Sequence, residues 1–305
     1  MFILNLIRGA FMGLADSIPG VSGGTIAFIM GFYNKFIDSI HALLSTESIQ
    51  KKKEALFFLI NLGIGWVVGM GLCVTLIANV IETKAYAVSS LFIGLIVAAI
   101  PLICSEEKDT IKGNYIHIIY TIIGIAVVAL ITYFSPTSHM GGPTEATEIT
   151  SGVNYFTGFS LPMALYLFFA GAVAISAMVL PGISGSTLLL IFGLYAKVMT
   201  SVKEVLHFNF EPVIMLIFFG LGIIAGISIS VAVLSKLLKT HRSEIVYLIL
   251  GLMIGSIYAV IMGPTTFDVP QAPLSFGTFS IIFFIIGIVV IVGLELLKRV
   301  MPSED

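Results

Sequence analysis

The chain has 305 residues, of which 58% are hydrophobic and only 10% are charged. Soluble domains carry roughly a quarter charged residues, so this composition excludes a water-soluble globular fold and indicates a protein surrounded by lipid. The formal net charge is −2 and no basic run is longer than Lys51–Lys53, which argues against nucleic acid as a partner.

Ten apolar segments follow one another along the chain. They cover residues 2–18, 20–44, 55–81, 86–104 and 115–134, and then residues 160–180, 182–206, 212–234, 244–263 and 276–297. Most reach the roughly 20 residues that a helix needs to cross a bilayer, and none alternates as a barrel strand does. The sequence therefore predicts an all-α polytopic membrane protein.

The two halves of the chain repeat each other. Residues 8–40 aligned with residues 170–202 share 13 identities in 33 positions, and these include prolines, serines, threonines, tyrosines and lysines. Further on, glycines recur at an offset of 157 residues. We expect a first membrane repeat over residues 1–134, an extracytoplasmic linker over 135–159 and a second repeat over 160–305.

The number of crossings predicts that the second repeat is inverted. Each half has a paired segment followed by three further apolar runs, so it makes an odd number of passes whether the pair crosses fully or dips in and returns. With both termini in the cytoplasm, the inside segments hold 11 of the 15 Lys and Arg residues, as the positive-inside rule requires. These are Arg8, Lys51, Lys52, Lys53, Lys108, Lys112, Lys236, Lys239, Arg242, Lys298 and Arg299.

Each paired segment contains a Pro-Gly-X-Ser-Gly break. Pro19-Gly20 interrupts the first pair and Pro181-Gly182 the second. Proline removes a backbone donor and glycine loosens a helix, so each break ends one helical arm and begins another. Freed backbone groups inside a membrane need protein or water around them. We interpret each pair as a re-entrant helical hairpin whose tip lines a cavity or an interface, with two complete crossings as the alternative.

The residues after the breaks are typical of an anion site. A helix that starts inside the membrane presents unpaired N–H groups and a partial positive charge, for which phosphate is the obvious ligand. Close helix packing by small residues is the competing explanation. The candidate phosphate-binding residues are Ser22, Gly23, Gly24 and Thr25 in the first half, and Ser184, Gly185, Ser186 and Thr187 in the second.

Two charged residues near the first break have uncharged counterparts in the second repeat. Arg8 and Asp16 correspond to Ala170 and Met178, and a charge at mid-membrane costs about 2.5–3.5 kcal/mol, so it tends to be absent unless needed. A substrate phosphate would satisfy Arg8, which could otherwise reach the headgroups. Asp16 either caps the restarted helix or takes part in coupling to protons or cations.

Two other repeated features have structural explanations. The Tyr33–Lys35 pair and its copy after Gly193 suit anchors in the headgroup region. The Gly-xxx-Gly pattern at Gly65 and Gly69, with its copy at Gly222 and Gly226, favours close helix packing.

The pattern Gly-X-Ser-Gly also occurs in rhomboid-type intramembrane serine proteases. Such an enzyme needs a base within reach of its serine, and no histidine here lies in the middle of an apolar segment. No P-loop lysine follows the glycines, and no spacing suits a metal, so we expect neither an enzyme nor a metal or other cofactor.

The motifs as a whole resemble a known family. Arg8-Gly-Ala, the stretch from Ala15 to Thr25 and the stretch from Leu180 to Thr187 are similar to those of the bacterial polyprenyl-phosphate transporters, over essentially the whole chain. The resemblance implies a plasma-membrane protein that returns undecaprenyl phosphate, the lipid carrier of wall polymers, to the cytoplasmic leaflet. It implies no residue roles.

The family resemblance and the residues both point to a phosphate. We expect a flippase that works by alternating access, in which the lipid phosphate binds between the hairpins while its prenyl tail stays in the bilayer. An ion-coupled transporter of small anions is the alternative. The sequence indicates neither the driving gradient nor the oligomeric state.

Overall fold

The computed structural model describes residues 2–16, 22–72, 84–134, 161–266 and 271–300, and all regular secondary structure within them is helical. The first half holds α1 (Phe2–Asp16), α2 (Gly23–Ile29), α3 (Tyr33–Leu44), α4 (Ile49–Leu72), α6 (Ala85–Glu106), α7 (Lys108–Ile111), η2 (Tyr115–His117) and α8 (Ile118–Tyr133). The second half holds α10 (Leu161–Val179), α11 (Gly185–Ile191), α12 (Tyr195–Leu206), α13 (Val213–Thr240), α14 (Arg242–Met262), η3 (Gly263–Thr266) and α15 (Ile281–Val300). The predicted linker, residues 135–159, lies outside the described residues.

Six helices of the described chain are long and apolar enough to cross a membrane, which confirms a multi-pass membrane protein. They are α4, α6, α8 with η2, α10, α13, and α14 with η3. α10 has 19 residues without a charged side chain, whereas its counterpart α1 has 15 residues and includes Arg8 and Asp16. By length and composition, therefore, α10 can span a bilayer and α1 cannot.

The arm that follows each break is shorter than the sequence predicts. Residues 20–44 were expected as one segment, but the chain turns between α2 and α3 at Gly31, and the second half turns in the same way at Gly193. Both glycines have a positive φ, 71° and 63°, a conformation that L side chains rarely adopt. α2 and α11 therefore have only seven residues each.

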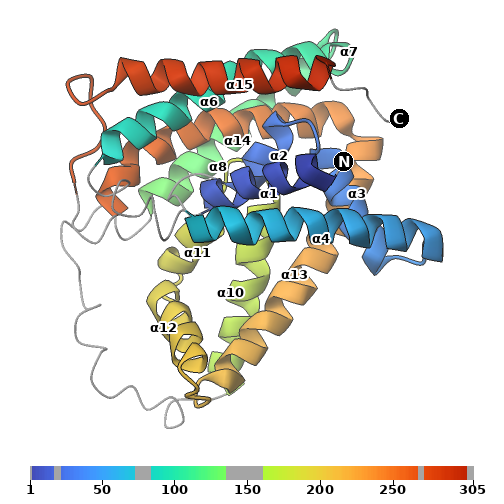
Figure 1. Cartoon of the computed structure of the whole chain (residues 1–305), viewed down its shortest axis with the longest axis vertical. Coiled ribbons are helices and arrows are strands. Elements are labelled where there is room, and N and C mark those ends of the chain that lie inside the picture. The colour runs from blue at the N-terminus through green and yellow to red at the C-terminus, as the bar shows by residue number, and fades with distance from the viewer. Residues whose placement is uncertain (1, 17–21, 73–83, 135–160, 267–270, 301–305) are drawn as a thin grey trace.

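Glycines bring two pairs of helices into close contact. A Cβ at Gly65 in α4 would overlap the carbonyl oxygen of Leu6 in α1, and a Cβ at Gly222 in α13 would overlap that of Phe168 in α10. The Gly-xxx-Gly prediction of close packing is confirmed. Figure 1 shows α1 lying along α4, and α10 beside α13.

Two further pairs cross between the halves of the chain. α6 packs against α15, and α8 packs against α14 (Figure 1). Gly94 of α6 meets the backbone of Phe284 in α15, and Gly251 of α14 meets the backbone of Thr121 in α8. Buried side chains of α14, including Ile249 and Met253, join the largest apolar core of the protein.

Replacing one of these contact glycines should destabilise the protein. We expect Gly222→Val to lower the free energy of unfolding by about 1–3 kcal/mol, because the new side chain would collide with the backbone of α10. Gly220→Val is the matched control on the same helix, since a Cβ there would meet nothing within 4 Å. Thermal unfolding in detergent measures both. Equal loss in the two variants would contradict close packing at Gly222.

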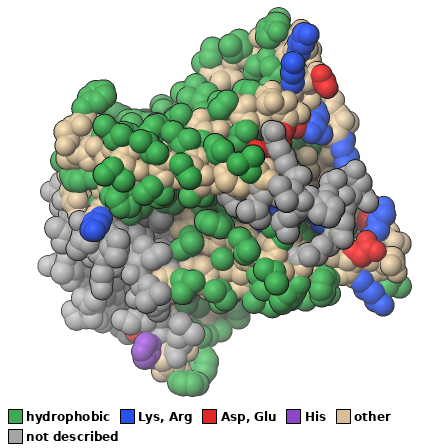
Figure 2. Space-filling model, turned by 45° about the horizontal axis from the view of Figure 1, so that its top comes forward, with side chains coloured by type: hydrophobic (Ala, Val, Ile, Leu, Met, Phe, Trp, Pro, Cys, Tyr) green, Lys and Arg blue, Asp and Glu red, His purple; other side chains and the backbone are tan. Residues whose placement is uncertain are grey.

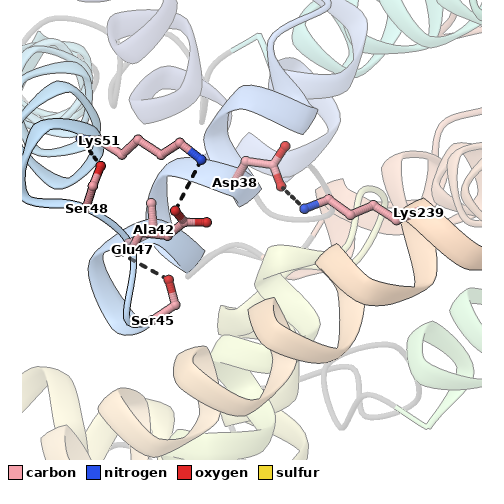
Figure 3. Close-up of polar contacts among 7 residues, drawn as sticks. All are labelled: Asp38, Ala42, Ser45, Glu47, Ser48, Lys51 and Lys239. Carbon is pink, nitrogen blue, oxygen red and sulfur yellow. Dashed lines mark hydrogen bonds and ion pairs between the residues drawn. The ribbon is translucent and has the colours of Figure 1, made fainter.

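Charged side chains gather at one end of the molecule. Figure 2 shows most of the visible Lys and Arg side chains along one edge of a surface that is otherwise largely hydrophobic. Lys239 of α13 forms an ion pair with Asp38 of α3 at 3.6 Å (Figure 3), and Arg242 of α14 binds Glu107 through two of its guanidinium nitrogens. These two ion pairs connect residues that belong to different halves of the chain.

The ion pair between Glu107 and Arg242 should make the stability of the protein depend on pH in the acidic range. Burial acts to raise the pKa of Glu107, but hydrogen bonds from Arg242 and Thr110 and the charge of Arg242 outweigh it, so this pKa lies below its ordinary 4.5. A lowered pKa in the folded state adds stability that is complete above about pH 4.5 and is lost as the pH falls further.

Arg242 is half-exposed, so we expect this contribution to be about 1 kcal/mol at most. The midpoint of thermal unfolding should be higher for the unchanged protein than for Glu107→Gln at pH 7. The difference should shrink below pH 4.5. A difference that persists unchanged at pH 3 would contradict this assignment.

Candidate functional site

The first motif forms the start of α2. Ser22 has an extended backbone and its Oγ accepts a hydrogen bond from the Gly24 N–H at 3.1 Å, so it is the N-cap of the helix. Ser22, Gly23, Gly24 and Thr25 are all buried. Pro19 and Gly20, the predicted break itself, lie outside the described residues.

Asp16 links the end of α1 to the start of α2. One carboxylate oxygen accepts the Gly23 N–H at 2.6 Å, and the other accepts the indole N–H of Trp66 in α4 at 2.9 Å. This is the capping role that the sequence analysis offered for Asp16. With Ser22 on the next amide, the first donors of α2 are engaged within the chain in this conformation.

The second motif forms a buried turn between α10 and α11. Pro181, Gly182 and Ser184 are buried, Gly185 begins α11 and Thr187 is half-buried. Gly182 has a φ of 91°, and a Cβ there would press on the backbone of Leu252 in α14, so both conformation and space require glycine. The side chain of Ser186 is outside the described set.

The two motifs meet in the middle of the protein. The Gly182 N–H donates to the hydroxyl of Thr25 at 2.8 Å, across 157 residues of sequence. A Cβ at Gly24 would lie 3.2 Å from the carbonyl oxygens of Met178 and Val179, a tight contact, so glycine favours this close approach. The start of α2 and the end of α10 are thus in direct contact.

Tyr33 adds a further bond to this junction. Its hydroxyl donates to the carbonyl oxygen of Val179 at 2.9 Å, and its side chain is 2% exposed. The prediction that Tyr33 is a headgroup anchor was therefore wrong. A tyrosine can bury its ring when its hydroxyl finds a partner, and the last carbonyl groups of a helix have none within it.

A pocket with a volume of 190 Å³ lies beside the junction. α1, α2, α3, α4, α10 and α13 all contribute to its wall. The lining is apolar except for Asp16 and the Trp66 ring nitrogen, and both polar groups are engaged with each other. The pocket is therefore suited to an apolar group rather than to a free ion.

Arg8 lies on α1 near this pocket. Its guanidinium stacks on the ring of Phe32 at 5.0 Å from the centroid and donates to the side-chain oxygen of Asn5 at 3.3 Å. It is half-buried, and no Asp or Glu oxygen of the described chain lies within 4.0 Å of it. A cation in this position can accept an anionic ligand without breaking an ion pair.

Sequence reasoning missed the role of Trp66. The residue gave no pattern to interpret, because its partner Asp16 is 50 positions away. One available signal was the comparison of the halves. Trp66 corresponds to Ile223, just as Asp16 corresponds to Met178, so both partners of this bond are specific to the first half.

Comparison with known proteins decides the family. The model of a family described as "VCA0040-like: Undecaprenyl phosphate translocase-like" matches residues 12–277. The chain belongs to this family. It is 33% identical over 287 residues to a polyprenyl-phosphate transporter of Staphylococcus aureus, covering 94% of each chain. It is 31% identical over 266 residues to one of Vibrio cholerae, covering 84% of this chain and 76% of that one.

No solved structure matches the chain significantly. The family match and the relatives confirm the resemblance read from the motifs. The protein is a membrane transporter of the polyprenyl-phosphate family and not an enzyme.

Proposed function

We propose that the protein returns undecaprenyl phosphate to the cytoplasmic leaflet of the bacterial plasma membrane by alternating access of two inverted repeats. The named function of the relatives supports the lipid phosphate as substrate. Each half comprises a re-entrant hairpin and three crossing helices, with residues 1–134 and 160–305 as the two repeats and both termini in the cytoplasm. In the second half this makes α10 an arm of the hairpin, although its length would allow it to span, and makes α15 the third crossing helix, although its apolar part is shorter than those of the six candidates. The phosphate binds between the halves.

Equivalent contacts in the two halves support the repeat. The contact of Gly65 with Leu6 corresponds to that of Gly222 with Phe168, at offsets of 157 and 162 residues. These are the offsets at which the two halves align in sequence. The pairing of α1 with α4 is therefore repeated by that of α10 with α13.

The contacts between the halves are also reciprocal. Gly94 contacts Phe284, and Gly251 contacts Thr121. Gly251 is the counterpart of Gly94 in the second half, and Phe284 is the counterpart of Thr121, so exchanging the two halves converts one contact into the other. Two copies related by a two-fold axis would pack in this way, because each copy gives and receives the same contact. This reciprocity supports two halves that are related by a pseudo-two-fold axis, as the proposed repeat requires.

The direction of the helices supports the inversion. α1 and α4 run in parallel, because Gly65 contacts Leu6 and, one turn later in both helices, Gly69 contacts Ala10. α10 and α13 are parallel for the same reason, since Gly222 contacts Phe168 and Gly226 contacts Ala172. α4 begins at the basic run Lys51–Lys53, whereas α13 ends at Lys239. If both basic ends are cytoplasmic, the two helix pairs run in opposite directions.

Arg8 is the observation on which the binding proposal depends. A half-buried guanidinium without a carboxylate partner in the described chain is costly inside a membrane unless a ligand neutralises it. The phosphate of a polyprenyl lipid supplies that charge, and its prenyl chain extends into the bilayer. Arg8 has no counterpart in the second half, where Ala170 is buried.

The motif residues take part when the halves separate. In the present conformation Thr25 and Gly182 bind each other, which holds the start of α2 against the turn before α11. Rocking of the halves breaks this bond and frees the Thr25 hydroxyl and the Gly182 N–H for the phosphate. The Gly23 and Gly24 amides join them when the phosphate displaces Asp16 and Ser22. The residues proposed for this step are Ser22, Gly23, Gly24, Thr25, Ser184, Gly185, Ser186 and Thr187.

Reconstitution of the purified protein into vesicles tests the proposal. Undecaprenyl phosphate should move between leaflets, as followed by its accessibility to a reagent that cannot cross the membrane. Runs with and without a pH gradient would show whether protons drive net movement. Vesicles that lack polyprenyl lipid test the alternative, because a small-anion transporter would release trapped phosphate from them, and that result would contradict our proposal.

A further inference from the structure

The pocket beside Asp16 is too apolar to hold a phosphate by itself. Its walls include Met12 of α1, Leu59 of α4, and Met178 of α10, and its single carboxylate already accepts two hydrogen bonds. A phosphate in this space would meet a like charge and few donors. An uncharged hydrocarbon group would gain from burial there.

The pocket has the volume for one small hydrocarbon group. Its 190 Å³ exceeds the roughly 150 Å³ of an engineered cavity that holds benzene, a six-carbon molecule. A prenyl chain is built of branched five-carbon units, so a single unit fits. Gly63 of α4 lies on the wall and is exposed, which places an opening of the pocket at this residue.

Arg8 lies one helical turn beyond the pocket. Arg8, Met12 and Asp16 are four residues apart and so share one face of α1, with Met12 and Asp16 on the pocket wall. Phe32, on which Arg8 stacks, similarly precedes the pocket residue Phe36 by one turn. A lipid whose phosphate binds Arg8 therefore has its first carbon atoms next to the pocket.

We propose that this pocket binds the isoprene unit adjacent to the phosphate, and thereby selects prenyl phosphates from other phosphate lipids. The inference rests on the proposed function, because it takes Arg8 as the phosphate partner. Asp16 sets the orientation of the ligand. Its negative charge at the far wall keeps the phosphate at the Arg8 end and leaves the hydrocarbon in the pocket.

A substitution at the opening of the pocket tests this inference. A Cβ at Gly63 would meet nothing within 4 Å, so Gly63→Leu adds a side chain at the opening of the pocket without a clash, where it should block entry of the ligand. Gly220→Leu is the matched control, because Gly220 is the equivalent residue of the second half, is equally free of contacts, and is not on the wall. Trp66, the only tryptophan of the chain, lines the pocket and reports its occupancy by fluorescence.

The probes are a three-unit prenyl phosphate, the matching prenyl alcohol, a straight-chain alkyl phosphate of equal carbon number, and inorganic phosphate. We expect both prenyl compounds to change Trp66 emission, and the prenyl phosphate to bind more tightly than the straight-chain phosphate. One buried methylene is worth roughly fourfold in affinity, so Gly63→Leu should weaken prenyl phosphate binding at least about tenfold. Gly220→Leu should leave it unchanged.

The inference is overturned if Gly63→Leu binds the prenyl phosphate as tightly as the unchanged protein, or if the straight-chain phosphate binds equally well. Gly63→Ala, which adds one carbon, provides a second test should the leucine variant not fold, and it should weaken binding by a smaller factor. Transport of undecaprenyl phosphate by the unchanged protein is measured in parallel. Its absence would contradict the proposed function instead, so the two failures are distinguishable.

Discussion

Arg8→Ala should reduce the transport of undecaprenyl phosphate by about 10- to 100-fold while the protein still inserts and folds. A hydrogen bond to a charged group is worth about 1.5–3 kcal/mol, and we expect the phosphate to lose at least one such bond. Folding should survive because the equivalent residue of the second half, Ala170, is fully buried in the corresponding helix. Vesicle transport and thermal unfolding measure the two effects separately.

Lys35→Ala is the control for a general loss of positive charge. Lys35 also stacks on a ring, that of Phe58 at 5.3 Å, but it is exposed and does not line the pocket. It should transport at the normal rate. Arg8→Lys should recover part of the activity, since it keeps the charge but not the bidentate fork. Normal transport by Arg8→Ala would remove Arg8 from the site.

Asp16→Ala should destabilise the protein by about 2–4 kcal/mol. The change leaves the Gly23 N–H and the Trp66 indole N–H without their acceptor in a partly buried site, and each lost bond to a charged group costs about 1.5–3 kcal/mol. Asp38→Ala is the matched control. It removes another carboxylate of the same half, which is half-exposed and accepts from Ser235 and Lys239. Its loss should be smaller, about 1 kcal/mol, because water can replace an exposed carboxylate and the Ser235 hydroxyl can rotate to another acceptor.

Asp16→Asn separates capping from coupling. Asparagine loses the charge and keeps one acceptor oxygen, so it can accept from Gly23 or from Trp66 but not from both. If Asp16 only caps the helix, the variant should lose about half the stability that Asp16→Ala loses, and its transport should respond to pH as before. If instead the variant folds normally but its transport no longer responds to a pH gradient, Asp16 takes part in coupling. Thermal unfolding and transport at two pH values decide between these outcomes.

The crossing helices could be predicted from sequence because their signals are local. Apolar length identified α4, α6 and α13, and the Gly-xxx-Gly spacing at Gly65 and Gly222 predicted close packing that the structure has. The short arms after each break were not predicted. Gly31 and Gly193 were visible as repeated residues, but apolar composition continues through both, and only the backbone conformation shows that the helix ends there.

The junction between the motifs could be predicted only in outline. The sequence analysis placed a binding site between the two hairpins, and Thr25 of the first motif does bind Gly182 of the second. The partners of Asp16 and Tyr33 could not be found, because Trp66 and Val179 are 50 and 146 residues away and no local pattern records such distances. The same limit applies to the pocket, whose wall comes from six helices.

Capping of α2 by Asp16 also changes how the anion site is understood. The sequence suggested free helix donors at Gly23 and Gly24, but a carboxylate and a hydroxyl already occupy them. In the proposed mechanism, charge neutralisation of the lipid phosphate in this conformation therefore comes mainly from Arg8. Separation of Thr25 from Gly182 would release the Thr25 hydroxyl and the Gly182 N–H, which connects binding to the movement of the halves.

Photochemical labelling with an undecaprenyl phosphate analogue that carries its reactive group on the first isoprene unit tests the central claim most directly. We predict that mass spectrometry will find the label on Met12, Trp66 and Met178, which line the pocket between the halves. Competition by unlabelled undecaprenyl phosphate should remove this label. Labelling confined to exposed outer residues such as Ile224 and Val289, with none in the pocket, would contradict the account.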